Sequence, residues 1–401
     1  MKHFETNAIR TQTDRTKYRE HSTPTFLTSS FVFDDAEHMR AMFAGEAAGN
    51  IYSRYSNPST SELIDKVCAM EGAEAGFTTA SGMSAVFTSI IAFLQQGDHV
   101  IASRAVFGST HQILTNILPR WGITHTYVDP ADVESWEQAV QPTTKMLILE
   151  TPSNPGLSLI DLAKAGDFAK THNLIFNVDN CFATPYLQRP IDFGADIVVH
   201  SATKWMDGQG RVLGGLIVGK EDLMPQIQTF IRHSGPAMSP FNAWIISKSL
   251  ETLAVRMDRH CSNALKLAEY LNNHSEINKV LYPHHPSHPQ YQLGKHQMNQ
   301  GGGIVTFEVK GGLERGSRFI DQIKMLSISS NLGDARSIIT HPSSTTHSKL
   351  KQEECLAVGI TPGLVRISVG LEHIDDIIKD VDQALVASSS SESISLIVAV
   401  P

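Results

Sequence analysis

Short apolar segments alternate with helical patterns through the first half of the chain, and this alternation restricts the possible folds more than any other feature. Runs rich in Val and Ile end at Ser103, Thr151, Asn180 and Gly219, and LAKAGDFAKTH (162–172) is typical of the helical patterns between them. Continuous apolar runs of this length indicate strands that are buried on both faces. The sequence therefore predicts an α/β fold with a mostly parallel sheet covered by helices on both sides.

A second, smaller domain is predicted after this sheet. A long helical stretch covers 247–270, and further strand patterns follow at 302–309 and 364–370. With 401 residues the chain is too long for one typical core. We expect an N-terminal arm (1–55) that lacks its own core and packs on another surface, a large domain (56–255), a small C-terminal α+β domain (256–388) and a mobile, Ser-rich tail (389–401).

Charge and cysteine content exclude several classes of function. The formal net charge is −8 and no run of Lys and Arg is present, which argues against nucleic-acid binding. The four cysteines are far apart and none forms a C-x-x-C pair, a pattern typical of a reduced, cytoplasmic protein rather than a disulfide framework. No apolar run is long enough to span a bilayer, and the first 15 residues lack the apolar core of a signal peptide.

The strand pattern 195–200 runs directly into Ser201, Thr203 and Lys204. Ligands of open parallel sheets bind beyond the carboxyl ends of the strands, where a lysine could reach into a crevice. Hydroxyl groups next to this lysine suit a phosphate, and the glycines that follow let the backbone pass close to a bound group. A surface lysine in a flexible loop is the competing interpretation.

Asp179 ends the preceding strand pattern, one helix-and-strand step before Lys204. Pyridoxal 5′-phosphate (PLP) requires a carboxylate against its ring nitrogen. The carboxylate keeps this nitrogen protonated, so that the ring can accept electrons. A helix cap is the alternative role for Asp179 by itself. Its position beside Lys204 favours the cofactor.

A strand-to-helix turn at Ser81, Gly82 and Met83 offers backbone N–H groups to a phosphate. The turn matches neither a GxGxxG nor a Walker pattern, and the glycines at 301–303 lack the Lys that a P-loop requires. A nucleotide-dependent α/β enzyme and a non-enzymatic binding protein are therefore the less favoured classes.

Four further candidates carry weaker signals. Tyr52 and Arg54 form an aromatic and cationic pair that could also be a surface loop, and Asn154 follows a strand where Asn-Pro also marks a plain turn. Arg366 lies inside a strand pattern, where it needs either a substrate carboxylate or an internal salt bridge. The histidines of 282–291 lack helical spacing, so we predict no metal site.

With these residues the chain resembles the Cys/Met-metabolism family of PLP enzymes, which includes cystathionine γ-synthases, cystathionine lyases, methionine γ-lyases and homoserine-ester sulfhydrylases. The resemblance extends over nearly the whole chain. Within the family, the sulfhydrylases that use O-succinylhomoserine are the most similar. The segments that indicate this subgroup are FGSTHQILTNILPRWGI, DGQGRVLGG, SGPAMSPFNAW and HPSSTTH.

The resemblance implies the PLP-dependent transferase fold type I, with seven strands in the large sheet and an N-terminal arm (1–55) that reaches a neighbouring subunit. It also implies a role for each candidate. Lys204 would hold PLP as a Schiff base, Asp179 would pair with its ring nitrogen, and Asn154 would contact the ring or the substrate. Arg366 would bind the substrate α-carboxylate, with Asn331 beside it. The phosphate would be held by Gly82, Met83, Ser201 and Thr203, and by Tyr52 and Arg54 of a neighbouring subunit in a homotetramer with shared sites.

Phe107 departs from the pattern of the lyases and cystathionine γ-synthases, which have a tyrosine stacked on the cofactor ring at this place. Phe107 can stack but has no hydroxyl to carry a proton. The implied function is γ-replacement, which makes homocysteine from O-succinylhomoserine and sulfide in methionine biosynthesis. The alternatives are O-acetylhomoserine as the substrate, cysteine as the nucleophile, or methionine γ-lyase activity.

Overall fold

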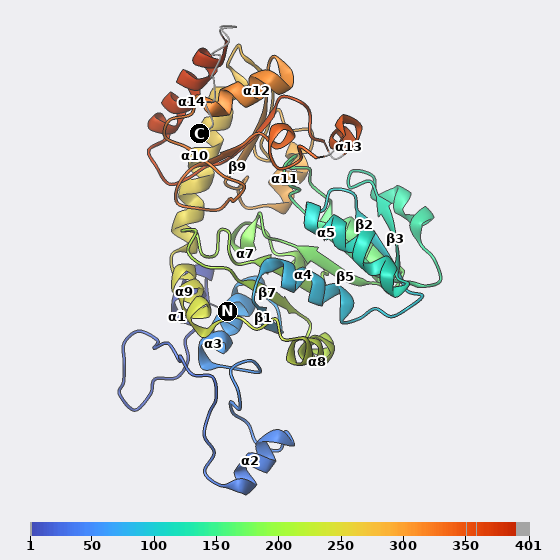
Figure 1. The fold of residues 1–401 in the computed structure, drawn as a ribbon, viewed down its shortest axis with the longest axis vertical. Coiled ribbons are helices and arrows are strands. Elements are labelled where there is room, and N and C mark those ends of the chain that lie inside the picture. The colour runs from blue at the N-terminus through green and yellow to red at the C-terminus, as the bar shows by residue number, and fades with distance from the viewer. Residues whose placement is uncertain (1, 350, 358, 390–401) are drawn as a thin grey trace, which may run out of the picture.

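The computed structural model describes residues 2–349, 351–357 and 359–389. It contains two sheets, one in the middle of the molecule and one near its C-terminal end, with an N-terminal arm that projects from the opposite end (Figure 1). The C-terminal tail after Ser389 lies outside the described residues, so the expectation of a mobile tail stays a prediction, as do the exact domain boundaries.

The large sheet has seven strands, and only β7 runs against the others. This confirms the predicted mostly parallel α/β sheet. In spatial order the strands are β1 (Ala75–Thr79), β7 (Gly215–Gly219), β6 (Ile197–Ser201), β5 (Ile175–Asp179), β4 (Thr144–Glu150), β2 (His99–Ser103) and β3 (Thr124–Val128).

Alternate residues of each central strand face two different helical layers, which explains the continuous apolar runs. On β4, Leu147 and Leu149 join one core and Met146 and Ile148 join the other. The first core is covered by α3 (Pro58–Glu71), α6 (Leu162–Thr171), α9 (Pro240–Leu250) and α10 (Leu253–Asn272), and the second by α4 (Gly82–Ile91) and α8 (Met224–Ser234).

Local chemistry sets the ends of these helices. Asn57 caps α3 by accepting the N–H of Ser59, Pro58 occupies the first turn, and Gly72 ends the helix at φ 80°. The predicted continuous helix over 247–270 is wrong, because α9 stops at Leu250 and α10 begins at Leu253. Thr252 Oγ1 donates to the Ser249 carbonyl at 3.1 Å. In a continuous helix that carbonyl would accept a backbone N–H instead, so this side chain competes with the helical hydrogen bond.

The small domain is built on a five-stranded sheet packed against α10, α12 (Gly312–Asp321) and α14 (Ile374–Ser389). Its spatial order is β10 (Ser327–Ile328), β11 (Ile338–Thr340), β12 (Leu364–Ser368), β9 (Ile304–Val309) and β8 (Ile277–Leu281). The remaining α-helices of the body are α5 (Gly108–Gln112), α7 (Thr184–Leu187), α11 (Tyr291–Gln297) and α13 (Gln352–Ala357).

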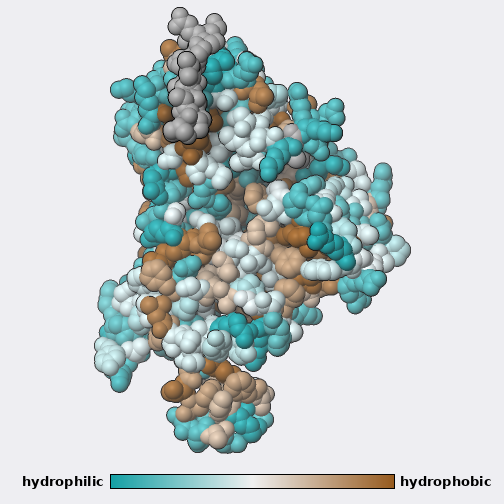
Figure 2. Space-filling model, in the orientation of Figure 1, coloured by the Kyte–Doolittle hydropathy of each residue, from teal (hydrophilic) through white to brown (hydrophobic). Residues whose placement is uncertain are grey.

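The N-terminal arm contains α1 (Phe4–Arg10) and α2 (Ala36–Phe43) and extends away from the body around α2. Hydrophobic colour gathers on its projecting end (Figure 2), where Val32 is 98% exposed and Phe43 52% exposed. The strand-like segment 26–33 makes only one bridge, Ser30 to Tyr52, because it has no neighbouring strand to pair with among the described residues of this chain.

Candidate active site

Three polar side chains follow neighbouring strands at one edge of the large sheet. Glu150 ends β4 and Asp179 ends β5, and the two are paired in register; Lys204 lies three residues after the end of β6. Because β4, β5 and β6 are adjacent and parallel, their carboxyl ends converge where ligands of open α/β sheets bind. We call this place the strand-end site.

Lys204 is held by a residue of the small domain. Its Nζ donates to Asn331 Oδ1 at 2.6 Å, across 127 positions of the chain. Burial lowers the pKa of the Lys204 amine, and the positive charge of Arg366 lowers it further, against the opposing effect of Cys181. The amine is therefore poised to act as a base at a lower pH than an exposed lysine.

Asp179 offers a carboxyl that forms no salt bridge with a described residue. Its Oδ1 accepts the N–H of Cys181 at 2.9 Å. Burial raises its pKa, with smaller opposing effects from the hydrogen bond to Cys181 and from the charge of His200. A protonated ring nitrogen would supply the missing positive charge, so this carboxyl fits PLP.

Glu150 is a site residue that the sequence reasoning missed. It is 5% exposed, and its Oε2 accepts the N–H of Phe107 at 2.6 Å. Burial raises its pKa well above the ordinary value, and the nearby Asp179 charge adds to the effect. The apolar run TKMLILE ends in an acid just as IFNVD does, and that shared signal could have identified Glu150.

The turn before α4 lies directly against the end of β6. A Cβ added to Gly82 would lie 2.5 Å from Ser201 Cβ, so only glycine permits this approach. Ser81 caps the helix, and Met83 follows in its first turn. The Thr203 hydroxyl accepts the N–H of Gly214 at 3.1 Å and donates to the Gly214 carbonyl at 3.4 Å, which fixes it beside the end of β6. The turn therefore brings together the donors predicted for a phosphate.

Arg366, on β12, is 6% exposed and holds two residues of the site. Nη1 donates to Asn154 Oδ1 at 2.9 Å and Nη2 to the Asn331 carbonyl at 3.0 Å. Its Nε is buried without a partner, and it forms no internal salt bridge with the described residues. Burial lowers its pKa to about 10. An unpartnered buried guanidinium N–H suits a substrate carboxylate.

The remaining predicted residues divide into two groups. Phe107 precedes α5, is 42% exposed and is fixed by its backbone to Glu150. Tyr52 and Arg54 contact other residues: the Arg54 guanidinium lies 5.6 Å from the Tyr52 ring, and it donates to the Arg232 carbonyl. Their described contacts include none of the strand-end residues, so their predicted role in a neighbouring subunit stays a prediction.

These features define the class of protein. A lysine, a carboxyl without a salt bridge among the described residues, a strand-to-helix turn and a buried arginine with an unpartnered N–H converge on one edge of a mostly parallel sheet, which is the arrangement of a PLP-dependent enzyme of fold type I.

The family follows from comparison with known proteins. The family model for Cys/Met metabolism PLP-dependent enzymes matches residues 5–386, and the chain belongs to this family. The chain is 44% identical over 384 residues to O-succinylhomoserine sulfhydrylase of Pseudomonas aeruginosa, covering 96% of this chain and 95% of that protein. It is 41% identical over 384 residues to L-methionine gamma-lyase of Fusobacterium nucleatum, covering 95% and 97%.

Solved structures agree in fold. A crystal structure described as an O-acetylhomoserine (thiol)-lyase from Campylobacter jejuni, with N′-pyridoxyl-lysine-5′-monophosphate, has a TM-score of 0.92 and 33% identity, covering 96% of this chain and 99% of that one. Cystathionine gamma-lyase from Lactobacillus plantarum, complexed with L-serine, has a TM-score of 0.91 and 33% identity, covering 97% and 100%. No helix in the described part of this chain is long and apolar enough to cross a membrane.

Proposed function

We propose that this enzyme performs γ-replacement on O-succinylhomoserine with sulfide, giving homocysteine and succinate. The observation that carries the proposal is the meeting of Lys204 and Arg366 on Asn331, whose side chain accepts from the lysine and whose carbonyl accepts from the arginine. Lys204 can act as a base and Arg366 can bind a carboxylate. Because Asn331 holds the two side chains close together, they suit chemistry at the α-carbon of an amino acid, which lies next to its carboxylate. The sulfhydrylase relatives support the choice of ester and nucleophile.

The cofactor is assigned to the strand-end site. Lys204 would hold PLP, Asp179 would face its ring nitrogen, and Phe107 and Asn154 would contact the ring. Its phosphate would be held by Gly82, Met83, Ser201 and Thr203. When bound, PLP supplies an electron sink for negative charge at the α-carbon.

The chain's own residues then position the substrate and move its protons. Arg366 receives the α-carboxylate through its fork, with the unpartnered Nε available for one bond. Lys204 Nζ, with its lowered pKa, accepts the α-proton and returns it after sulfide has replaced succinate at the γ-carbon. Asn331 fixes the direction of the amine through its 2.6 Å contact.

Methionine γ-lyase activity is the second candidate, because relatives of that name are 41–43% identical to this chain. Phe107 argues against it, since a phenyl ring can stack on the cofactor but cannot relay a proton. The same fold and the same site chemistry would also suit cystathionine γ-synthase activity, or O-acetylhomoserine as the ester.

The active enzyme is proposed to be a cytoplasmic homotetramer built from dimers with shared sites. The exposed apolar arm supports a site completed by a second subunit, as does Arg54, whose described contacts lie away from Lys204. Mixing an inactive Arg54→Ala protein with an inactive Lys204→Ala protein should restore part of the activity. No recovery despite proven subunit exchange would contradict a shared site.

The proposed function is tested by comparing substrates with sulfide. We expect homocysteine as the main product and a higher kcat/KM for O-succinylhomoserine than for O-acetylhomoserine. 2-Oxobutyrate from methionine as the main product, or preference for cysteine over sulfide, would assign the chain to another member of the family.

A further inference from the structure

A cationic cavity of about 410 Å³ adjoins the strand-end site. It lies between the ends of β2 and β3 and residues 346, 347, 349, 354 and 360 of the small domain. Arg104 and Tyr127 line it on the large-domain side, His347 and Lys349 line it on the other, and Asn154 belongs to its wall. We call it the Arg104 cavity.

Asn154 connects this cavity to the substrate anchor. Its Oδ1 accepts from Arg366 Nη1 at 2.9 Å, so the wall of the cavity touches the group that would hold the α-carboxylate. The residues on both sides of Phe107, Val106 and Gly108, also line the cavity. A chain that extends from an amino acid bound at Arg366 therefore has an opening directly beside it.

The cavity carries an uncompensated positive charge. The guanidinium of Arg104 lies 5.6 Å from the centre of the Tyr127 ring, which holds it without neutralising it. Neither Arg104 nor Lys349 forms an ion pair with a described residue, and Glu354 is the one carboxylate among the described lining residues. Two cations against one anion favour an anionic occupant.

We propose that the Arg104 cavity receives the distal carboxylate of the acyl group, and that Arg104 is the residue that selects a succinyl over an acetyl ester. This inference rests on the proposed function and extends it to the leaving group. The substrate would be held at both ends, its α-carboxylate on Arg366 and its acyl carboxylate on Arg104. An acetyl group has no distal carboxylate, so the guanidinium of Arg104 would stay bound to water instead of the ester.

The test measures kcat/KM for O-succinylhomoserine and O-acetylhomoserine with sulfide in the PLP-loaded wild type and in Arg104→Gln. The ratio of the two values should fall roughly 10- to 100-fold, as expected on loss of a charge-assisted hydrogen bond. Only the kcat/KM for O-succinylhomoserine should fall, and the value for O-acetylhomoserine should stay as in the wild type. Arg104→Lys should recover part of the ratio, because it restores the charge without the planar fork.

Arg120→Gln provides a matched control. Arg120 is exposed in the 3₁₀ turn Leu118–Trp121, which precedes β3 and therefore lies toward the opposite edge of the sheet. This variant should keep the wild-type ratio. Lys349→Gln provides a second cavity variant if Arg104→Gln does not fold, and it should lower the same ratio by a smaller factor.

Failure of the cavity's role and failure of the proposed function give different results. A wild type that makes homocysteine from neither ester contradicts the proposed function. A wild type that prefers the succinyl ester, with the same preference in folded Arg104→Gln and Lys349→Gln, overturns the role of the Arg104 cavity and leaves the proposed function intact.

Discussion

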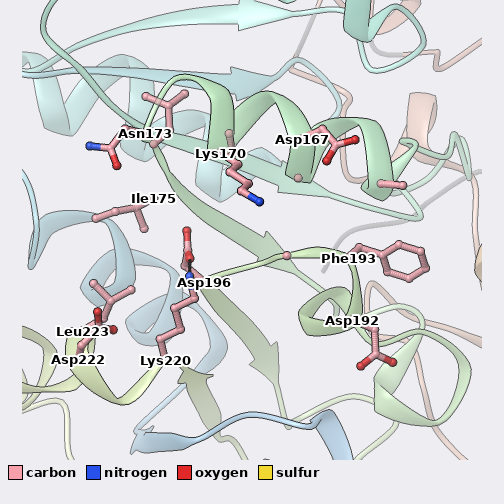
Figure 3. Close-up of a pocket in the computed structure, with 15 residues that line it drawn as sticks. Asp167, Lys170, Asn173, Ile175, Asp192, Phe193, Asp196, Lys220, Asp222 and Leu223 are labelled. Carbon is pink, nitrogen blue, oxygen red and sulfur yellow. Dashed lines mark ion pairs between the residues drawn. The ribbon is translucent and has the colours of Figure 1, made fainter.

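The two edges of the large sheet both carry charged residues beside a cavity, but their charges are arranged differently. At the amino-end edge a cavity of about 790 Å³ is lined by residues that include Asp196 and Lys220 (Figure 3). Lys220 Nζ lies 2.5 Å from Asp196 Oδ1, and Asp196 Oδ2 accepts the N–H of Phe176 at 2.8 Å. These two charges satisfy each other and the backbone.

At the carboxyl-end edge the polar groups lack such partners. Asp179 has no ion pair within the described residues, and the Nε of Arg366 is buried without an acceptor. In the larger cavity, at the amino-end edge, Asp196 and Lys220 are therefore already paired with each other. Unpartnered polar groups, and not cavity size, therefore distinguish the edge to which we assign the cofactor.

The sharpest test of this contrast replaces one lysine at each edge. Lys204→Ala should lower kcat by roughly 10²–10⁴-fold, because it removes the acid–base group, and should abolish the visible absorption of the bound cofactor. Lys220 is 53% exposed in its side chain, so Lys220→Ala should change the stability by only about 0–1 kcal/mol and leave turnover unchanged. Equal losses in the two variants would remove the distinction between the edges.

An aspartate pair gives the next largest effect. Asp179→Asn should weaken cofactor binding by roughly 100-fold or more, since the ring nitrogen would lose a buried ionic partner. Asp196→Asn, the matched change at the amino-end edge, should leave cofactor affinity as in the wild type. Titration of each protein with PLP, followed by visible absorption, measures both values; wild-type affinity in Asp179→Asn would contradict its assignment.

Phe107→Tyr tests how the carboxyl-end edge selects the reaction. The added hydroxyl should favour elimination and raise the ratio of 2-oxobutyrate to homocysteine several-fold, below the roughly 10²–10⁴-fold of a fully positioned proton donor. Stacking should be kept, because both rings offer the same face. Phe193→Tyr, at the amino-end cavity, is the control. An unchanged ratio with a normal visible spectrum would make Phe107 a packing residue.

The smallest expected effect is on the pH dependence of stability. Burial raises the pKa of Glu150, so the folded protein binds more protons than the unfolded chain between the ordinary carboxyl pKa and the raised one. Stability of the cofactor-free protein should therefore fall as the pH rises through this window, by up to about 1.4 kcal/mol per pH unit. Glu150→Gln should flatten this slope in urea unfolding; an unchanged slope would show that another group causes it.

The sequence determined the elements and their order. Continuous apolar runs, which indicate strands buried on both faces, predicted the mostly parallel sheet, and polar residues at the ends of two runs predicted Lys204 and Asp179 as neighbours. The rule that parallel strands end at one edge was sufficient for this, because it depends on local pattern and chain order. The same pattern was present at Glu150.

Tertiary structure alone decided the contacts between distant segments. Lys204 meets Asn331 across 127 positions, and Arg366 meets Asn154 across 212. The sequence left Arg366 with two roles, a substrate anchor or an internal salt bridge, and only the packing of the small domain showed its Nε without a partner. Nothing in the sequence gave a reason to select Arg104, because only the fold decides whether a carboxylate lies close enough to pair with it. Local periodicity sets where strands form, whereas the packing of two domains sets which polar groups remain unsatisfied.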